Sequence, residues 1–329
     1  MMKIGILTNR ERVEQFYDLS TLPQDWQLIF AGETKTEEEV LQLLSDADVL
    51  FADVIRPVSR RLIMALPSLK LIQSEGVGYN KFDLAAATER GIYVCNNAAG
   101  NSGAVAEQTI LLMLALLRRL QEGDALVRQG KQIIAKTQFI LDGIYELQAC
   151  RVGLIGFGAI GQAVAKRLQA FGCPVAYYCR QPLPQAKSYG AVYTPLPELL
   201  QQSHIVSLHL PATPETQNFL DAAKLQQMRQ GAILINTARG EVMDQQAVAE
   251  ALKSGSLAAA GFDTLAPEPV PADHPLLQLP EHLRYRVLFS PHIGGTTYQA
   301  FAGMHRHAWQ NILAISRGER PTNIVNQID

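Results

Sequence analysis

The sequence lacks the features that mark several large classes of protein. It has no block of like charges and its formal net charge is −2, so nothing in it indicates a nucleic-acid partner. Its four cysteines show no C-x-x-C or C-x-x-H spacing, which gives no sign of a metal site and favours free thiols in a reducing compartment. We therefore predict no metal, no disulfide and no nucleic acid for this chain.

Long apolar runs are also missing. The longest, Ile110–Leu117, is far shorter than the roughly 18 residues that a membrane-spanning helix requires. The N-terminus begins with a strand-like run, Ile4–Leu7, and then meets Arg10, Glu11 and Arg12, which is not the pattern of a signal peptide. We expect a cytoplasmic protein with no membrane partner.

The same apolar run has a second implication. Residues 110–117 are apolar around the whole circumference of a predicted helix, so this helix must be buried on every side. Burial in the core of the chain and burial in an interface between subunits both meet that requirement.

What the sequence does contain is a regular alternation of strand-like runs and helical patterns over its 329 residues. Strands separated by helices of this size predict parallel sheets with helices on both faces, a doubly wound α/β fold. The predicted strands are 4–7, 28–30, 49–52, 71–73, 93–95, 152–155, 175–179, 204–210, 232–236, 257–262 and 287–290.

A glycine-rich turn lies near the middle of the chain. Gly156, Gly158 and Gly161 follow a strand-like run with the spacing G-x-G-x-x-G, and a helical pattern comes directly after them. The first glycine permits a tight turn, the second lets the backbone approach a pyrophosphate, and the third lets helix pack on strand. The helix that starts at Ala159 and Ile160 offers free N–H groups and the positive end of its dipole to phosphates. This context predicts a dinucleotide site.

Two glycine-containing loops, 100–103 and 294–297, divide the chain. Because the glycine turn begins the second sheet, residues 101–293 are predicted to form the dinucleotide-binding domain and residues 1–100 a substrate domain. The terminal segment, 294–329, contains a predicted helix that is expected to return to the substrate domain. The fold predicted in this way is two Rossmann-like or flavodoxin-like domains with a cleft between them.

The strand after the glycine turn indicates which dinucleotide is bound. An NAD site usually carries Asp or Glu at the end of this strand, about 20 residues past the glycines. No Asp or Glu occurs between Phe157 and Pro197, and Cys179 and Arg180 occupy the strand end. Arg180 could bind the 2′-phosphate of NADP through hydrogen bonds worth about 1.5–3 kcal/mol, a roughly ten- to hundredfold preference. We predict NADP(H) as the preferred cofactor and keep NAD(H) as the alternative.

Three ionisable side chains, those of Arg239, Glu268 and His292, each follow the end of a later predicted strand. Because the carboxyl ends of parallel strands share one edge of a sheet, we expect the three side chains at the same rim. Arginine can hold a carboxylate bidentately, and histidine can exchange a proton near neutral pH beside a carboxylate. Together they predict hydride transfer coupled to proton transfer.

Seven short motifs occur in order along nearly the whole chain, at 75–80, 105–107, 156–161, 209–216, 236–240, 263–269 and 291–295. Together they resemble those of the D-isomer-specific 2-hydroxyacid dehydrogenases. The resemblance implies an NAD(P)-dependent oxidoreductase with two α/β domains, which is usually a homodimer. The segment Arg180-Gln181-Pro182 looks like that of the NADPH-using glyoxylate/hydroxypyruvate reductases of this family.

The resemblance also implies a role for individual residues. Arg239 would hold the carboxylate and carbonyl of the substrate, Glu268 would be the partner of His292, and His292 would be the acid–base residue. Val77 and Gly78 would offer backbone N–H groups to the substrate carboxylate. The further residues implied on the cofactor side are Pro211, Thr216, Thr237, Ala238, Asp263 and Gly294.

These expectations combine into one hypothesis, a reductase that converts a small 2-ketoacid such as glyoxylate, hydroxypyruvate or pyruvate to the D-2-hydroxyacid. Two alternatives stay open. The family's fold also serves corepressors, which bind protein partners in response to NAD(H). The enzyme could instead act on a phosphorylated or bulky 2-hydroxyacid, for which Arg56 and Lys81 are candidate phosphate-binding residues.

Overall fold

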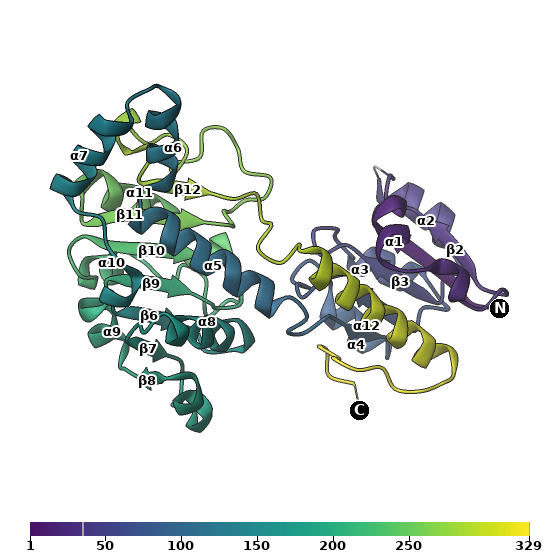
Figure 1. Cartoon of the computed structure of the whole chain (residues 1–329). Helices are drawn as coiled ribbons and strands as arrows, with labels where there is room; N and C mark the ends of the chain where they lie inside the picture. The colour runs from purple at the N-terminus through teal and green to yellow at the C-terminus, as the bar shows by residue number, and fades with distance from the viewer. Residues whose placement is uncertain (35, 329) are drawn as a thin grey trace. The chain divides into compact units, whose positions relative to one another are not determined.

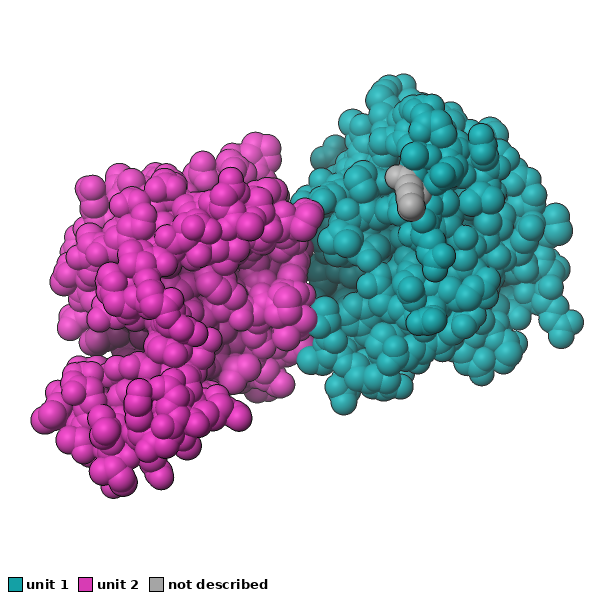
Figure 2. Space-filling view, turned by 90° about the horizontal axis from the view of Figure 1, so that it is seen from above, with its two compact units in different colours: residues 1–101, 296–329 teal, residues 102–295 magenta. Residues whose placement is uncertain are grey.

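The computed structural model describes residues 1–34 and 36–328, which form two compact units (Figures 1 and 2). Unit 1 is Met1–Asn101 with Thr296–Asp329, and unit 2 is Ser102–Gly295. Each unit has one parallel sheet with helices packed against both of its faces. The predicted doubly wound α/β class is therefore confirmed.

The sheet of unit 1 has the strand order β2-β1-β3-β4-β5, the arrangement of flavodoxin-like folds. Its central strands β3 and β4 are buried on both faces, as the apolar runs of parallel strands require, whereas the edge strand β2 is not. The elements are β1 (Lys3–Leu7), α1 (Arg10–Phe16), β2 (Gln27–Phe30), α2 (Glu37–Leu44), β3 (Val49–Ala52), α3 (Arg60–Ala65), β4 (Leu71–Ser74), α4 (Leu84–Glu89), β5 (Tyr93–Cys95) and α12 (Tyr298–Ser316).

The long terminal helix α12 packs on the sheet of unit 1, on the face that also carries α1 (Figure 1). Trp309 of α12 is fully buried, and its ring stacks on Tyr17 at 5.2 Å and on Phe51 at 5.7 Å between ring centroids. After α12 the chain runs along β5, where Val325 N donates to Val94 O at 2.8 Å. The last part of the sequence thus completes the core formed by the first part.

The sheet of unit 2 has the order β12-β11-β10-β9-β6-β7-β8. Counted from β6, this is the Rossmann order 3-2-1-4-5-6 with one further strand, and the order reverses between β6 and β9. The elements are α5 (Ser102–Leu117), α6 (Leu120–Arg128), α7 (Gln132–Asp142), β6 (Val152–Ile155), α8 (Ala159–Ala170), β7 (Val175–Tyr178), β8 (Ala191–Tyr193), α9 (Leu196–Gln202), β9 (Ile205–Leu208), α10 (Ala222–Gln227), β10 (Ala232–Asn236), α11 (Gln245–Ser254), β11 (Leu257–Phe262) and β12 (Val287–Phe289).

Short 3₁₀ helices occur at five places among the described residues, namely η1 (Leu19–Thr21), η2 (Leu147–Ala149), η3 (Pro184–Tyr189), η4 (Gly240–Val242) and η5 (Glu281–Leu283). In the same part of the chain no helix combines the length and the apolar character that crossing a membrane would require.

Helix α5 is buried on most of its circumference, but not on all of it. Ile110, Leu112 and Met113 are buried against the core of unit 2, whereas Leu111 is 52% exposed. Burial in the core of one chain therefore does not cover every side of residues 110–117, and burial in a subunit interface stays a prediction. The exposed residues of this helix are Glu107 and Leu111, one turn apart, on the side that the core does not cover.

Candidate active site

The glycine turn after β6 has the close backbone approaches that its spacing predicts. Gly156 has φ +96°, and a Cβ atom built there would lie 2.3 Å from the carbonyl oxygen of His209. A Cβ on Gly161 would lie 2.4 Å from the carbonyl oxygen of Gly156. Around Gly158, by contrast, no heavy atom lies within 4 Å of a built Cβ. The first and third glycines are thus required by the fold, and the second leaves open space.

Helix α8 starts at this open space without a side-chain cap. Gly158 is its N-cap residue, and no side chain accepts a hydrogen bond from the first turn, which begins with Ala159 and Ile160. A helix of this length presents its first N–H groups and about half a positive charge at its N-terminus. These features fit the pyrophosphate of a dinucleotide.

At the end of β7, Cys179 and Arg180 occupy the place where an acidic residue would bind ribose hydroxyls. The Sγ of Cys179 lies 2.8 Å from Gln181 O, and burial raises the pKa of this thiol. Arg180 is exposed. A hydrogen bond from the Thr213 side chain is the main cause that lowers the pKa of Glu215, and the charge of Arg180 adds a smaller contribution.

Asp263, directly after β11, organises the loop that carries His292. Its Oδ1 accepts hydrogen bonds from Ser290 Oγ at 2.5 Å and Ile293 N at 3.0 Å, and its Oδ2 accepts one from Gly294 N at 2.8 Å. Its carbonyl oxygen also accepts from His292 N at 2.9 Å. Asp263 is only 3% exposed, so its carboxylate acts within the loop. Gly294 is required here because a Cβ would lie 2.8 Å from Oδ2 of Asp263.

His292 and Glu268 come together as the sequence predicts. The Nδ1 atom of His292 lies 2.9 Å from Oε1 and 3.0 Å from Oε2 of Glu268. His292 has φ +54°, a left-handed conformation that non-glycine residues adopt uncommonly. Since Nδ1 is occupied by the carboxylate, Nε2 is the ring nitrogen left to meet a reacting group.

A pocket of about 470 Å³ in unit 2 adjoins this pair. Its walls include Phe262, Leu265, Val270, Leu277 and Phe289. Apolar walls lower the local dielectric constant and so strengthen the interaction between the imidazole and the carboxylate.

Arg239 follows β10 on the same sheet edge and is half-buried. The amide of Asn236 fixes its loop, since Nδ2 donates to Arg239 O at 2.8 Å and Oδ1 accepts from Ala238 N at 2.9 Å. The next residue, Gly240, allows this loop to touch the Leu265–Ala266 backbone, because a Cβ would lie 2.3 Å from Ala266 N. One guanidinium nitrogen of Arg239 donates a hydrogen bond to Ala238 O at 2.7 Å. The remaining guanidinium nitrogens make no hydrogen bond to any described residue.

The remaining predicted cofactor residues lie on the same edge of unit 2. Thr237 is buried, with its hydroxyl 2.9 Å from that of Thr109 in α5. Thr216 donates to Pro211 O at 2.6 Å and so closes the loop after β9. His209, in the same loop, was not predicted as a site residue; burial lowers its pKa to about 4, so it is uncharged at neutral pH.

In unit 1, Val77 and Gly78 lie in a loop that exposes two N–H groups. The carbonyl oxygens of both are occupied, by Asn96 Nδ2 at 2.8 Å and by Ser74 Oγ at 2.7 Å respectively. The N–H groups of Val77 and Gly78 make no hydrogen bond with any described residue of the chain. Because the acceptors are bonded and two adjacent donors are not, the loop can bind an anion.

A dinucleotide cradle and a histidine–carboxylate pair on one sheet edge place the chain in the class of nicotinamide-dependent oxidoreductases. The model of the D-isomer specific 2-hydroxyacid dehydrogenase NAD binding domain matches residues 110–294. The chain is 35% identical to the glyoxylate reductase of Korarchaeum cryptofilum over 99% of this chain and 97% of that protein. It is 38% identical to the glyoxylate reductase of Thermococcus litoralis over 88% of this chain and 86% of that protein.

Solved structures agree with this assignment. The D-lactate dehydrogenase of Aquifex aeolicus, in complex with NAD and lactic acid, is 27% identical, superposes with a TM-score of 0.82 and covers 96% of both chains. The chain belongs to the D-isomer specific 2-hydroxyacid dehydrogenase family. It is an oxidoreductase that uses a nicotinamide dinucleotide.

Two glycine substitutions should separate folding from cofactor binding. Gly156→Ala should lower the free energy of unfolding by about 2 kcal/mol or more, because of its positive φ and the backbone clash. Gly158→Ala should leave the melting temperature unchanged but weaken dinucleotide binding, because its Cβ enters the open space. Thermal unfolding and titration of cofactor fluorescence would measure both effects, and tight dinucleotide binding by Gly158→Ala would contradict the placement of the cradle.

Proposed function

We propose that the protein reduces a small 2-ketoacid (glyoxylate, hydroxypyruvate or pyruvate) to the D-2-hydroxyacid, with NADPH as the preferred reductant. The observation that carries this proposal is the His292–Glu268 pair, 2.9 Å apart, on the sheet edge that also holds Arg239. The name glyoxylate reductase, borne by relatives at 35% and 38% identity, supports the choice of substrate class.

In the proposed mechanism, His292 supplies the proton. Glu268 accepts a hydrogen bond from Nδ1, which orients the ring and stabilises its protonated form. Nε2–H then donates its proton to the carbonyl oxygen of the substrate as that oxygen gains negative charge. A nicotinamide dinucleotide, when bound, supplies the hydride that adds to the carbonyl carbon. Arg239 holds the substrate carboxylate with its unbonded guanidinium N–H groups.

The loop of unit 1 provides the second group of carboxylate donors in this proposal. Val77 and Gly78 have free N–H groups, whereas the carbonyl oxygens around them are already bonded. Backbone N–H donors bind a carboxylate without bringing a charge of their own, so they fix its position at little cost in desolvation. The proposed cofactor contacts are Gly156, Gly158, Ala159, Ile160, Gly161, Arg180, Pro211, Thr216, Thr237, Ala238, Asp263 and Gly294.

Arg180 supports the choice of NADPH. It is exposed at the end of β7, where its guanidinium can meet a 2′-phosphate, and Cys179 beside it offers no carboxylate to repel that phosphate.

The position of Arg56 favours an unphosphorylated substrate. Its guanidinium donates to Gly32 O at 3.2 Å and to Thr34 O at 3.0 Å, and lies 2.5 Å from the Thr34 hydroxyl. An arginine whose donors already cap a backbone turn has few N–H groups left for a phosphate. Of the two candidate phosphate-binding residues, Arg56 is therefore not available, which favours the small 2-ketoacids over sugar-acid phosphates; Lys81 is exposed.

A homodimer is also part of the proposal, as the family resemblance implies. Helices α6 and α7 of unit 2, with the loop after them, carry many exposed apolar side chains. They are Leu120, Val127, Ile133, Ile134, Ile140, Leu141 and Tyr145, between 53% and 76% exposed. So many exposed apolar side chains on two neighbouring helices are unusual on a monomer and typical of an interface, and Leu111 of α5 is also exposed.

The substrate and cofactor choices can be tested together. A panel of 2-ketoacids assayed with NADPH and with NADH should give the highest kcat/KM for glyoxylate or hydroxypyruvate with NADPH. Arg180→Ala should lower kcat/KM with NADPH roughly ten- to hundredfold and leave the value with NADH nearly unchanged. Lys187→Ala, which removes an exposed cation from nearby η3, is the control. A wild-type preference for NADH would refute the cofactor proposal.

The role of His292 can be tested by turnover. His292→Ala should lower kcat by about 10²–10⁴-fold, the usual contribution of general acid–base catalysis, without changing dinucleotide binding. His282→Ala, at an exposed histidine of the same unit, should keep the wild-type kcat. If His292→Ala turns over 2-ketoacids at a near-normal rate, the mechanism is wrong.

The dimer proposal concerns the surface of α6 and α7. The double variant Ile133→Glu/Ile140→Glu should sediment as a monomer at concentrations where the wild type is a dimer, because charged side chains cannot be buried unpaired in an interface. Val192→Glu, at an apolar side chain of β8 that is 67% exposed, should remain dimeric. Analytical ultracentrifugation distinguishes these outcomes, and a monomeric wild type would overturn the proposal.

A further inference from the structure

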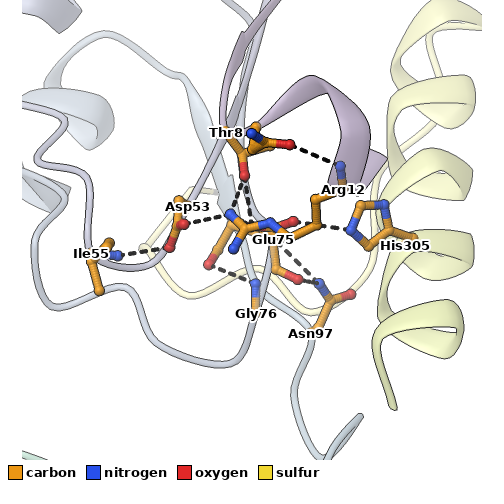
Figure 3. Close-up of polar contacts among 10 residues, drawn as sticks. Thr8, Arg12, Asp53, Ile55, Glu75, Gly76, Asn97 and His305 are labelled. Carbon is orange, nitrogen blue, oxygen red and sulfur yellow. Dashed lines mark hydrogen bonds and ion pairs between the residues drawn. The ribbon is translucent and has the colours of Figure 1, made fainter. Parts of the chain in front are cut away.

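A group of polar and charged side chains in unit 1, including the half-buried Arg12 and the buried His305, surrounds Glu75, the residue directly after β4 (Figure 3). Glu75 is only 3% exposed. It is followed at once by Gly76, Val77 and Gly78, the loop with the free N–H groups. Removing a carboxylate from water is costly unless partners compensate, so its presence beside this loop requires a physical explanation.

Both carboxylate oxygens of Glu75 have partners from distant parts of the chain (Figure 3). Oε2 lies 2.7 Å from a guanidinium nitrogen of Arg12 and accepts a hydrogen bond from Thr8 Oγ1 at 3.1 Å. Oε1 lies 3.0 Å from Nε2 of His305, which is fully buried in α12. Since an ionised carboxylate can only accept hydrogen bonds, Nε2 of the imidazole is the donor. We call Arg12, Glu75 and His305 the Glu75 cluster.

Arg12 joins this cluster to a second loop. The same guanidinium nitrogen that contacts Glu75 lies 2.5 Å from Oδ2 of Asp53, just after β3, and also donates to Thr8. The other oxygen of Asp53 accepts from Ile55 N at 3.1 Å. The carboxyl ends of β1, β3 and β4 are thus tied together through one arginine.

Helix α12 also fixes the backbone on either side of Glu75. His307 Nδ1 lies 2.7 Å from Asn97 Oδ1, and Asn97 Nδ2 donates to Glu75 O at 2.8 Å and to Ser74 O at 3.1 Å. Asn97 N donates to Gly76 O at 2.9 Å. Each carbonyl from residue 74 to residue 78 therefore has a donor, and the N–H groups of Val77 and Gly78 are left without an acceptor among the described residues.

Stability alone does not account for this arrangement. A buried ion pair adds little net stability compared with apolar residues of similar volume, and the cluster leaves Arg12 Nε and His305 Nδ1 buried without partners. What the cluster does provide is a single geometry for the residue that precedes the anion-binding loop. The positive charge of Arg12 also offsets the negative charge that Glu75 would otherwise place next to a bound carboxylate.

We infer that the Glu75 cluster positions the Val77–Gly78 N–H groups for the substrate carboxylate, an inference that rests on the proposed function of that loop. Glu75, Arg12 and His305 are positioning residues, since they act on the substrate through the loop. The class of ligand they serve is a small α-ketocarboxylate.

The test compares Glu75→Gln with Glu89→Gln, which makes the same chemical change at an exposed ion pair of unit 1. Glu75→Gln should raise KM for glyoxylate about tenfold, as loss of one charge-assisted hydrogen bond would. KM for NADPH and kcat at saturating glyoxylate should stay within about twofold of the wild-type values, because the proposed role of the loop is to bind the substrate carboxylate and not the reacting carbonyl. Glu89→Gln should leave all three parameters unchanged.

Two milder variants keep the inference testable if Glu75→Gln does not fold. Thr8→Val removes one donor to Glu75 with little change in shape and should raise KM for glyoxylate about fivefold. His305→Gln retains an N–H donor and should stay nearer to the wild-type KM than His305→Phe, which has none.

The outcomes separate positioning from simple structural support. A lower melting temperature with unchanged KM for glyoxylate would mean that the cluster only stabilises unit 1, and the inference would be wrong. A parallel rise in KM for NADPH would overturn it as well, because it would indicate general loosening.

A readout without turnover distinguishes failure of this inference from failure of the proposed function. Hydrogen–deuterium exchange of the peptides covering residues 73–79 and 95–98 should be faster in Glu75→Gln than in Glu89→Gln. Equal exchange in the two variants would overturn the positioning role. A wild-type protein that reduces no 2-ketoacid would instead refute the proposed function, whatever the exchange shows.

Discussion

The buried carboxylate of Asp263 supports the whole edge of unit 2 that carries His292. It accepts three hydrogen bonds from residues 290–294, and its carbonyl accepts a fourth from His292 N. Hydrogen bonds to a charged acceptor contribute about 1.5–3 kcal/mol each, whereas a left-handed non-glycine residue costs about 1–3 kcal/mol. The hydrogen bonds that Asp263 accepts therefore outweigh the backbone strain at His292. Without them, the backbone conformation that directs the imidazole toward Glu268 would not be stabilised.

One constraint operates in both units, although their strand orders differ. Parallel strands bring every following loop to one edge, and ligand sites form where the order reverses. In unit 2 this place lies between β6 and β9, where Gly156 meets His209. In unit 1 it lies between β1 and β3, where Arg12 meets Asp53. In unit 2 this edge carries the partly exposed His292–Glu268 pair, while in unit 1 it carries a buried carboxylate, Glu75, followed by a loop with two unbonded N–H groups.

The sequence was sufficient for the fold class and for most strands, because buried parallel strands are continuous apolar runs. The short edge strand β8 was missed, since a three-residue run with exposed Val192 has no such signature. The meeting of His292 with Glu268 was predictable from strand ends and the family motifs. The structural roles of Asp263 and Glu75 could not be predicted from the sequence. The spacing of residues does not give the direction of a side chain, and it does not show that Glu75 contacts His305, 230 positions further along the chain.

Helix α12 has a consequence for the order in which the protein assembles as it is made. Unit 2 is a continuous stretch, Ser102–Gly295, and can fold once that stretch has left the ribosome. Unit 1 lacks Trp309 and His305 until the final segment has emerged, although its sheet was synthesised first. During that interval the face of β3 and β4 that α12 will cover is open to water. The half of the protein that is synthesised first is thus the half that finishes folding last, and the nascent chain must keep that apolar face from aggregating throughout synthesis.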